Sequence, residues 1–242
     1  MSKPRRARFV ALADLLRHHR PDIDPDAIRA GNVLIDGRVL TNPAARVRAD
    51  AAIRVAPARR LRGDVKLSHA LDAFDLSVAG RVSLDVGASA GGFTTALISR
   101  GARRVYAVDT GVGQLLSRLR ADRRVVNLEG HNLGALHRTD VPDVVEVITM
   151  DLSYLAVADA VGQLDVVQTA AEADLVALVK PTFELHRAMV AASEDDIDDA
   201  LDLAAAAIVA ARWRVIATCA AAPTGRRGAR EAFIHAQRRA TH

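Results

Sequence analysis

Cysteine is nearly absent from this 242-residue sequence, which contains only Cys219. A single cysteine forms neither an intramolecular disulfide nor a cysteine-rich zinc site, so we expect a reducing compartment, most simply the cytoplasm. The longest uninterrupted apolar run, 203–211, is far shorter than the roughly 18 residues that a membrane-spanning helix needs. The Arg-rich start leads into no apolar segment, so the sequence predicts neither a signal peptide nor a membrane span.

Aromatic residues and lysines are also scarce. Aromatic residues make up 3% of the chain, which disfavours recognition of bases by stacking and favours arginine contacts to phosphates. Of the 33 basic residues, 30 are arginines and three are lysines: Lys3, Lys66 and Lys180. A partly buried lysine can lose its proton whereas arginine cannot, so the two internal lysines are candidate functional groups. The eight histidines show no zinc-like spacing, and no metal site is predicted.

Positive charge is distributed unevenly along the chain. The net charge is +8 over residues 1–62, −10 over 63–211 and +6 over 212–242, which gives +4 for the whole sequence. A basic head and tail around an acidic centre are typical of a protein whose ends bind nucleic-acid phosphates. The alternative interpretation of the head is a basic, solvated surface without a partner.

The head, residues 1–56, predicts a small α/β nucleic-acid-binding domain. Asp24 followed by Pro25 is typical of a helix start. Two apolar runs surround Asp-Gly within 33–40, which predicts a hairpin, and 52–55 is a candidate further strand. A helix, a hairpin and a strand that carry several arginines are compatible with a compact nucleic-acid-binding module.

The segment 57–63 is Arg-rich and predicts a linker before a second domain at 64–242. The arginines of the head and the linker that are candidates for binding nucleic acid, RNA if the family resemblance given below holds, are Arg29, Arg38, Arg46, Arg48, Arg59, Arg60 and Arg62. From residue 64, helices alternate with short apolar strands, which predicts a parallel α/β sheet with helices on both faces. Strands are expected at 81–86, 105–108, 144–150, 175–179 and 214–219, and helices at 66–74, 92–100 and 195–212.

The strongest local signal is the sequence LDVGASAGGF at 84–93, where an apolar strand enters a glycine-rich turn and then a helix. Asp85, Gly87 and Gly91 give the spacing Asp-x-Gly-x-x-x-Gly instead of the dinucleotide pattern Gly-x-Gly-x-x-Gly. This spacing disfavours a nicotinamide oxidoreductase and suits a ligand with a cationic amino-acid part, such as S-adenosylmethionine (SAM). Asp109 follows the next strand and could accept the ribose hydroxyls of an adenosine; the alternative is a helix N-cap.

Two further strands end in candidate reactive side chains. Asp151 follows the strand at 144–150, and Lys180 follows the strand at 175–179. The carboxyl ends of neighbouring parallel strands meet at one crevice, so both side chains can face a ligand held by the glycine-rich turn. For Lys180 the alternative is an ordinary surface lysine.

Lys66, Asp151, Lys180 and Glu231, in this order, resemble the Lys-Asp-Lys-Glu tetrad of the FtsJ-type ribose 2′-O-methyltransferases. The segments LDVGASAGGFT, GARRVYAVDTGVGQL, MDLSYL and VKPTFE are similar to the TlyA (hemolysin A) branch, in which an S4-type RNA-binding domain precedes the methyltransferase. The resemblance implies a Rossmann-like class I SAM-dependent methyltransferase fold with a small S4-like N-terminal domain. It also implies 2′-O-methylation of ribose in ribosomal RNA, free or in ribosomal subunits.

The resemblance assigns roles to these residues. Lys180 would take the proton from the ribose hydroxyl, and the other three tetrad members would orient and tune it; two neighbouring lysines lower each other's pKa while carboxylates raise it. The cofactor contacts that it implies are Asp85, Gly87, Ala88, Ser89, Gly91, Gly92, Phe93, Asp109, Glu129 and Asn132. Ser89 and Asn132 could instead be ordinary turn residues.

Two other functions stay open at this point. The first is an RNA-binding or ribosome-assembly protein that retains the methyltransferase fold without turnover. The second is a membrane-active hemolysin, which the lack of a spanning or strongly amphipathic segment disfavours. The sequence predicts no oligomeric state and does not identify the methylated nucleotide.

Overall fold

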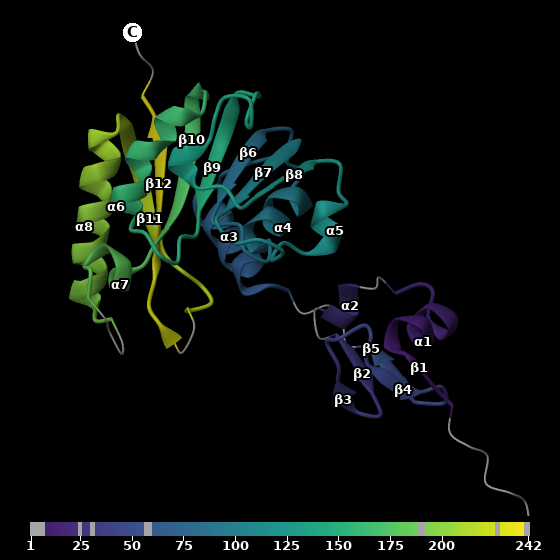
Figure 1. Cartoon of the computed structure of the whole chain (residues 1–242). Helices are drawn as coiled ribbons and strands as arrows, with labels where there is room; N and C mark the ends of the chain where they lie inside the picture. The colour runs from purple at the N-terminus through teal and green to yellow at the C-terminus, as the bar shows by residue number, and fades with distance from the viewer. Residues whose placement is uncertain are drawn as a thin grey trace, which may run out of the picture. The chain divides into compact units, whose positions relative to one another are not determined.

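The chain forms two compact units, residues 1–60 and 61–242, in a computed structural model (Figure 1). The residues that the structure describes are 8–23, 26–29, 32–55, 60–187, 192–225 and 228–239. The predicted helix start at Asp24 and Pro25 lies outside the described residues, as does Arg59.

The first unit contains two small antiparallel sheets. Its elements are β1 (Phe9–Ala11), α1 (Leu12–His19), α2 (Asp26–Arg29), β2 (Val33–Ile35), β3 (Arg38–Val39), β4 (Arg46–Arg48) and β5 (Ile53–Val55). Strand β1 pairs with β4, and β2 lies between β3 and β5. The predicted hairpin is confirmed as β2–β3, with Asp36 and Gly37 at positive φ in its turn. The first unit has its own hydrophobic core, which includes Leu12, Leu16 and Ile28.

The second unit is built on a seven-stranded sheet of order β11-β12-β10-β9-β6-β7-β8. Its strands are β6 (Val82–Val86), β7 (Arg104–Asp109), β8 (Val125–Glu129), β9 (Val145–Met150), β10 (Thr169–Val179), β11 (Trp213–Ala220) and β12 (Ala232–Arg238). Its helices are α3 (Arg62–Ala73), α4 (Gly92–Ser99), α5 (Ser117–Arg120), η1 (Leu133–Ala135), α6 (Val157–Ala160), η2 (Val161–Val166), α7 (Pro181–Glu184) and α8 (Glu194–Ala210).

The sheet is mixed, which corrects the prediction of a parallel sheet. The strands from β10 to β8 are parallel, but β12 lies between β10 and β11 and is antiparallel to both. No strand was predicted at β12, where the polar residues His235 and Gln237 interrupt the apolar run. His235 is buried there with its Nε2 atom 2.8 Å from Asp174 Oδ1, so a polar side chain is satisfied inside the sheet.

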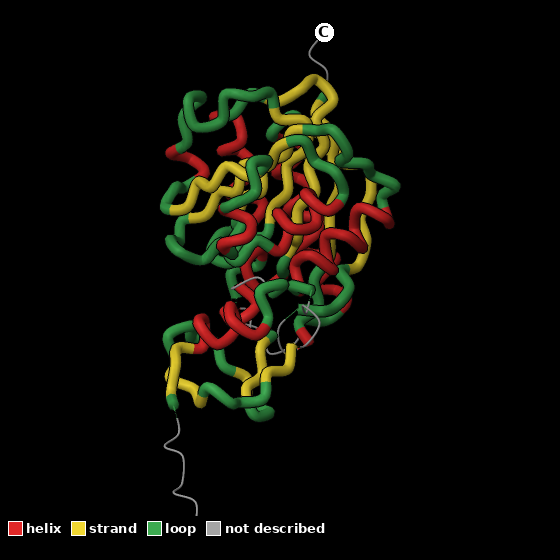
Figure 2. The backbone as a smooth tube through the Cα atoms, turned by 90° about the vertical axis from the view of Figure 1, so that its right-hand side faces the viewer, coloured by secondary structure: helices red, strands yellow, loops and turns green. Residues whose placement is uncertain are grey.

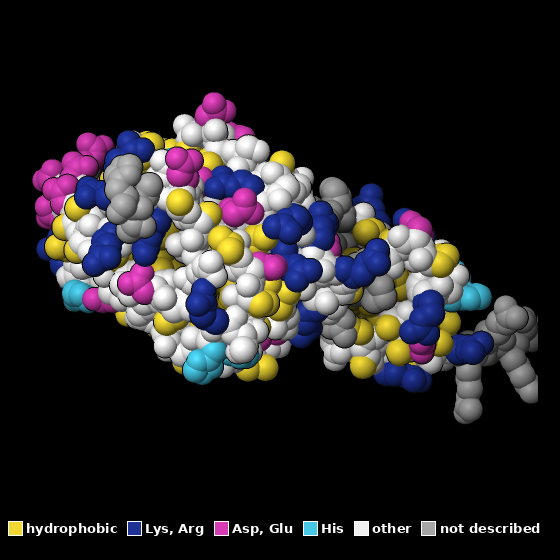
Figure 3. Space-filling view, turned by 90° about the horizontal axis from the view of Figure 1, so that it is seen from above, with side chains coloured by type: hydrophobic (Ala, Val, Ile, Leu, Met, Phe, Trp, Pro, Cys, Tyr) yellow, Lys and Arg dark blue, Asp and Glu magenta, His cyan; other side chains and the backbone are white. Residues whose placement is uncertain are grey.

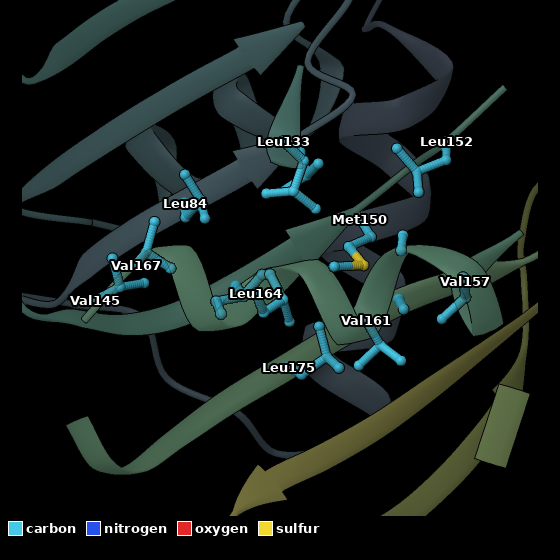
Figure 4. Close-up of a cluster of buried hydrophobic side chains, with 14 of the residues drawn as sticks. Leu84, Leu133, Val145, Met150, Leu152, Val157, Val161, Leu164, Val167 and Leu175 are labelled. Atoms are coloured by element: carbon cyan, nitrogen blue, oxygen red, sulfur yellow. The ribbon is translucent and has the colours of Figure 1, made fainter. Parts of the chain in front are cut away.

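Helices cover both faces of the sheet, as predicted. Helices α3, α4 and α5 lie on one face, and Figure 2 shows helices on the side toward the viewer in front of the strands. Elements η1, α6, η2 and α8 lie on the other face (Figure 1). The larger core lies between the sheet and this second layer, where Leu84, Met150 and Leu164 are buried (Figure 4). Within the described residues, no helix is long and apolar enough to cross a membrane.

The junction before the second unit differs in detail from the predicted linker. Helix α3 begins at Arg62, inside the segment 57–63, and includes Lys66. Its start packs against α4, since a Cβ atom on Gly92 would lie only 2.9 Å from the Cα atom of Gly63. The glycine pair therefore permits a close helix crossing that brings Lys66 to the edge of the sheet.

The topology brings distant segments to one edge of the sheet. The parallel strands β6, β9 and β10 end at this edge, and β12 begins there because it runs in the opposite direction. Asp151, Lys180 and Glu231 are adjacent to these strand ends in the chain. A Rossmann-like sheet binds its ligands at this edge, so the fold positions the predicted reactive residues together.

Two arginines of the basic C-terminal segment lie at opposite ends of strand β12. Arg230 precedes β12, whereas Arg238 ends it and pairs in register with Trp213. Arg238 Nη2 lies 3.0 Å from Asp165 Oδ1. Figure 3 looks onto the end at which β12 finishes and shows basic and acidic side chains interspersed on that face. The described part of the basic tail therefore does not form one continuous positive surface.

Candidate active site

A cavity of about 550 Å³ opens at this edge of the second unit. All four members of the predicted tetrad line it: Lys66, Asp151, Lys180 and Glu231. Five of the predicted cofactor contacts line it as well: Gly87, Ala88, Ser89, Gly92 and Phe93. Two internal lysines, two carboxylates and the glycine-rich turn thus share one cavity, although they come from segments far apart in the chain.

Lys180 and Asp151 form the first ion pair of the cavity. Lys180 Nζ lies 2.6 Å from Asp151 Oδ1 and donates a hydrogen bond of 2.7 Å to the Leu152 carbonyl. The side chain of Lys180 is 15% exposed and that of Asp151 is 28% exposed. An ammonium has three N–H donors, so these two acceptors leave one position on Nζ for another group.

Backbone contacts fix both members of this pair. Lys180 follows β10 and is the N-cap residue of the one-turn helix α7, where Pro181 takes the first helical position. The backbone N–H of Asp151 donates to Val86 O at 3.0 Å, which ties the end of β9 to β6. The two strand ends therefore carry Lys180 and Asp151 at a fixed separation.

Lys66 and Glu231 form the second ion pair, across a sequence separation of 165 residues. Their side chains are 8% and 10% exposed, so the pair is largely removed from water. Gly225 leaves room for the carboxylate, because a Cβ atom at this position would lie 2.6 Å from Glu231 Oε1. The tetrad is thus arranged as two lysine–carboxylate pairs.

The glycine-rich turn reaches the same cavity. Gly87 adopts φ 85°, and a Cβ atom on it would lie 2.5 Å from the backbone oxygen of Asp151. A residue with a side chain would therefore push the turn away from the end of β9. Gly91 is the left-handed N-cap of α4 but does not line the cavity, and a Cβ atom there would meet the side chains of Leu115 and Leu119.

Asp85 is fully buried behind the turn and does not line the cavity. Its carboxylate accepts hydrogen bonds from Thr94 Oγ1 at 2.6 Å and from Thr149 Oγ1 at 3.0 Å. Burial raises the pKa of Asp85 to about 7, although the two threonine hydroxyls act in the opposite direction. In this structure Asp85 joins β6 to α4 and β9.

The remaining predicted cofactor contacts hold backbone groups instead of lining the cavity. Asp109 accepts the N–H groups of Ser89 at 2.8 Å and Gly111 at 2.7 Å. Asn132 caps η1 by accepting the N–H of Gly134 at 3.2 Å, which is the turn role considered for it from the sequence.

Glu129 anchors the loop that follows β7. Its Oε1 atom accepts the N–H groups of Gln114 at 2.5 Å and Leu115 at 2.9 Å, and Asn127 donates to Oε2 at 2.9 Å. Burial acts to raise the pKa of Glu129, but the Leu115, Asn127 and Gln114 donors outweigh it and the net shift is downward. The loop in turn reaches the glycine-rich turn, because Ser89 Oγ donates to Gln114 Oε1 at 3.0 Å.

The predicted RNA-binding arginines occupy several environments. In the first unit, Arg38 is exposed on β3, and Arg46 and Arg48 flank the buried Val47 on β4. Arg46 donates to Phe9 O at 2.9 Å, and Arg48 is paired with Asp50 at 2.6 Å.

The other predicted RNA-binding arginines lie near the junction or are not described. Arg60 is exposed and has an interaction partner within the chain. Arg62 lines the cavity and donates to Gly225 O at 3.3 Å. The side chain of Arg29, like the whole of Arg59, lies outside the described residues.

The sequence did not indicate three groups that the structure places at the site. The carbonyl of Leu152 is a backbone group, which no sequence pattern identifies. Arg230 lines the cavity, and its place beside the predicted Glu231 was the available signal. Gln114 lies in the loop after β7 and reaches the glycine-rich turn through Ser89, a contact that no sequence pattern indicated.

Comparison with known proteins identifies the family. The model for the FtsJ-like methyltransferases matches residues 59–238 of this chain. The chain belongs to the FtsJ-like methyltransferase family.

Individual relatives of this FtsJ-like methyltransferase carry two kinds of name. The 16S/23S rRNA (cytidine-2′-O)-methyltransferase TlyA of Mycobacterium tuberculosis is 43% identical over 169 residues, which is 68% of this chain and 63% of that protein. Hemolysin A of Brachyspira hyodysenteriae is 34% identical over 179 residues, 73% of this chain and 74% of that protein. The match with TlyA thus spans less than two thirds of that relative.

A solved structure matches nearly the whole of this FtsJ-like chain. It belongs to a Streptococcus thermophilus protein that is also named as a hemolysin, and it superposes with a TM-score of 0.69 at 26% identity. The match covers 96% of this chain and 89% of that structure. The mixed sheet with helices on both faces is accordingly the Rossmann-type methyltransferase fold that the sequence predicted.

Proposed function

We propose that this chain is a SAM-dependent methyltransferase that 2′-O-methylates ribose in ribosomal RNA. The observation that carries the proposal is the cavity in which both internal lysines and both carboxylates of the tetrad meet the glycine-rich turn. The family match and the relatives named for rRNA methylation support the same chemistry.

The residues of the cavity fit SAM as a cofactor. The volume of the cavity, about 550 Å³, lies within the range of small-molecule sites, roughly 300–1,000 Å³. Gly87, Ala88 and Ser89 would hold the cofactor from the turn, with Gly92 and Phe93 beside them. When bound, SAM supplies an electrophilic methyl group. Asp109, Glu129 and Asn132 stay predictions as cofactor contacts, since their side chains bind backbone in this structure.

Lys180 is the residue best placed to handle the proton of a ribose hydroxyl. A 2′-hydroxyl is a weak acid and must lose its proton as its oxygen attacks a methyl group. Asp151 and the Leu152 carbonyl hold Nζ and leave one of its positions for the hydroxyl. In the neutral form, that position is a lone pair that takes the proton, and Asp151 then stabilises the ammonium that results.

Lys66 and Glu231, which line the same cavity, would orient the substrate. Their ion pair is buried, and a buried lysine that retains a carboxylate partner is a fixed donor. Holding the hydroxyl in line with the methyl donor replaces a search through many orientations, which is a large part of the rate gain in such reactions.

The partner we propose is ribosomal RNA, free or in a ribosomal subunit, and the site of action is the cytoplasm. The first unit would act as an S4-like RNA-binding domain through arginines such as Arg38, Arg46 and Arg48, which are exposed on its strands. Phosphate contacts release counterions, so RNA affinity should fall steeply as salt concentration rises. A binding constant independent of salt would contradict this part of the proposal.

The test is methyl transfer to defined RNA. The full chain is incubated with SAM and with naked rRNA, each ribosomal subunit or whole ribosomes, and nucleosides are analysed by mass spectrometry for 2′-O-methylation. We expect one substrate to gain a methyl group with the wild type and Lys180→Ala to lose about 10²–10⁴-fold in rate while retaining SAM binding by calorimetry. If none of these substrates were methylated, the proposed enzymatic activity would be wrong, and the alternative of a non-catalytic RNA-binding protein would be favoured.

A further inference from the structure

Glu184 is a buried carboxylate close to the cavity that the proposed reaction does not use. It ends helix α7, four residues after Lys180, and is 3% exposed. Pro181, Thr182 and Phe183 line the cavity, but Glu184 does not. Burying a carboxylate is unfavourable unless it is well satisfied, so its partners indicate what it does.

The partners of Glu184 belong to another segment of the chain. Its Oε1 atom accepts the N–H of Val157 at 2.6 Å, and Oε2 accepts the N–H of Ala158 at 3.2 Å. These are the first two residues of helix α6. Burial raises the pKa of Glu184, against the effect of these two N–H donors.

This contact is more than a local helix cap. The N-cap position of α6 is Ala156, which has no side chain that could accept a hydrogen bond. A serine or aspartate there would cap a four-residue helix without the burial of a glutamate from elsewhere. The effect specific to Glu184 is to connect α7 with α6.

This connection completes a closed chain of hydrogen bonds that includes the Lys180 amine. The backbone N–H of Glu184 donates to Lys180 O at 3.1 Å. Lys180 Nζ donates to Leu152 O at 2.7 Å, and Leu152 begins the loop that ends at Val157. The segment 180–184 therefore holds both ends of the loop 152–157, one through the lysine side chain and one through the glutamate.

We propose that Glu184 is a positioning residue for the methyl-transfer reaction, which sets the Lys180 amine by fixing the loop 152–157 against the end of β10. The inference rests on the proposed function and adds to it a residue outside the tetrad. If Val157 is released from Glu184, the loop 152–157 keeps its attachment to β6 through the Asp151 N–H but loses its attachment to α7. The Leu152 carbonyl can then shift, which weakens one of the two acceptors of the Lys180 amine.

A carboxylate fits this role better than an amide. It accepts two N–H groups at once through its two oxygens. Glutamine at this position would present one acceptor and one NH₂ donor, so one of the two N–H groups of α6 would face another donor. Glu184→Gln should keep the fold and part of the positioning, whereas Glu184→Ala removes both hydrogen bonds.

The experiment compares both variants with a matched glutamate at the other end of the sheet. Glu146 Oε2 also accepts a backbone N–H, from Val82 at 2.8 Å, but has no connection to the cavity. For wild type, Glu184→Gln, Glu184→Ala and Glu146→Gln, we would measure kcat, KM for the RNA, SAM affinity by calorimetry and the thermal midpoint.

We expect kcat to fall about tenfold for Glu184→Gln and about 100-fold for Glu184→Ala, with KM and SAM affinity within about twofold of wild type. Glu146→Gln should lower the thermal midpoint and leave kcat within about twofold. Partial retention of kcat by glutamine relative to alanine is the signature of positioning.

Three results would overturn the inference while wild type stays active. These are unchanged kcat in both Glu184 variants, a loss of SAM affinity that parallels kcat, or an equal loss of kcat in Glu146→Gln. An inactive wild type would overturn the proposed function itself, and the role of Glu184 in it.

Discussion

At the carboxyl ends of the parallel strands, where the cavity opens, two regions use acidic side chains in different ways. At the ends of β9 and β10 and the start of β12, Asp151 and Glu231 each pair with a lysine. At the ends of β7 and β8, Asp109 and Glu129 accept backbone N–H groups of the neighbouring loops. The first region contacts the cavity directly, whereas the second shapes the loop beside it.

This difference separates reactive groups from structural ones. A lysine paired with a carboxylate is held in place but keeps a further position on Nζ that can face a substrate. A carboxylate saturated by backbone donors is fixed, and its removal changes the conformation of the loop instead of the chemistry. The two regions should therefore respond differently to mutation.

The largest effect is expected in the first region, from breaking the buried Lys66–Glu231 pair. Glu231→Gln leaves a buried ammonium without its carboxylate, which should lower the free energy of unfolding by about 3–5 kcal/mol. Lys66→Met added to Glu231→Gln removes the unpaired charge and should restore much of this loss without restoring methyl transfer. Urea denaturation measures the free energy.

An Asp109→Asn variant is the comparison from the second region. Asparagine retains one acceptor for the N–H groups of Ser89 and Gly111, so its loss of stability should be smaller. An equal loss in Glu231→Gln and Asp109→Asn would remove the distinction between the two regions.

Asp85 lies between the two regions, and its pH dependence gives the next largest effect. Burial raises the pKa of Asp85 to about 7. Its contribution to stability is therefore complete below the unfolded pKa of roughly 4 and is lost as pH rises to about 7, by about 1.4 kcal/mol per pKa unit. Asp85→Asn should gain thermal stability relative to wild type over this range and no more above it.

The matched control for Asp85 is Asp174, at the other end of the sheet. Burial opposes ionisation there, but His235 and Arg81 outweigh it and lower the pKa of Asp174. Asp174→Asn should therefore cost stability at neutral pH and progressively less as pH falls through the native pKa of Asp174. Thermal midpoints measured from about pH 2 to 8 test both assignments, because the Asp85 difference should change between about pH 4 and 7 and the Asp174 difference only below about pH 4. Differences that did not depend on pH would contradict both.

Residues at strand ends were predictable from the sequence because topology alone brings them together. Asp151 and Lys180 follow apolar strands, so a parallel sheet places them at one edge whatever the loops do. The scarcity of lysine marked Lys66 as a candidate and its helix was predicted, but its place beside the other reactive residues required the family resemblance. Glu231 required the resemblance altogether, since no strand was predicted at β12.

Loop geometry was beyond the sequence for a physical reason. Whether Glu129 faces a ligand or a backbone depends on where Gln114 and Leu115 lie, and these positions follow from packing of residues distant in the chain. The hydrogen bond of Lys180 to the Leu152 carbonyl could not be predicted from the sequence either, because every residue has a carbonyl.

A smaller effect should show that Glu129 acts through its loop. Glu129→Gln weakens the acceptor for the N–H groups of Gln114 and Leu115, so their hydrogen exchange in the cofactor-free protein should rise about tenfold. SAM affinity should fall as a consequence. If exchange without cofactor were unchanged while SAM affinity fell, Glu129 would be a direct cofactor contact, as the family resemblance implies.

The smallest effect is expected from Asn132, which caps the short helix η1 through the N–H of Gly134. Asn132→Ala removes this one hydrogen bond and should lower the free energy of unfolding by about 1 kcal/mol. Asn132→Ser retains a capping oxygen and is the matched control. SAM affinity measured by calorimetry should be equal in both variants and wild type, because a cap on η1 does not touch the cavity. A loss of affinity in Asn132→Ala that serine does not correct would place the amide in contact with the cofactor and extend the reactive region to the end of β8.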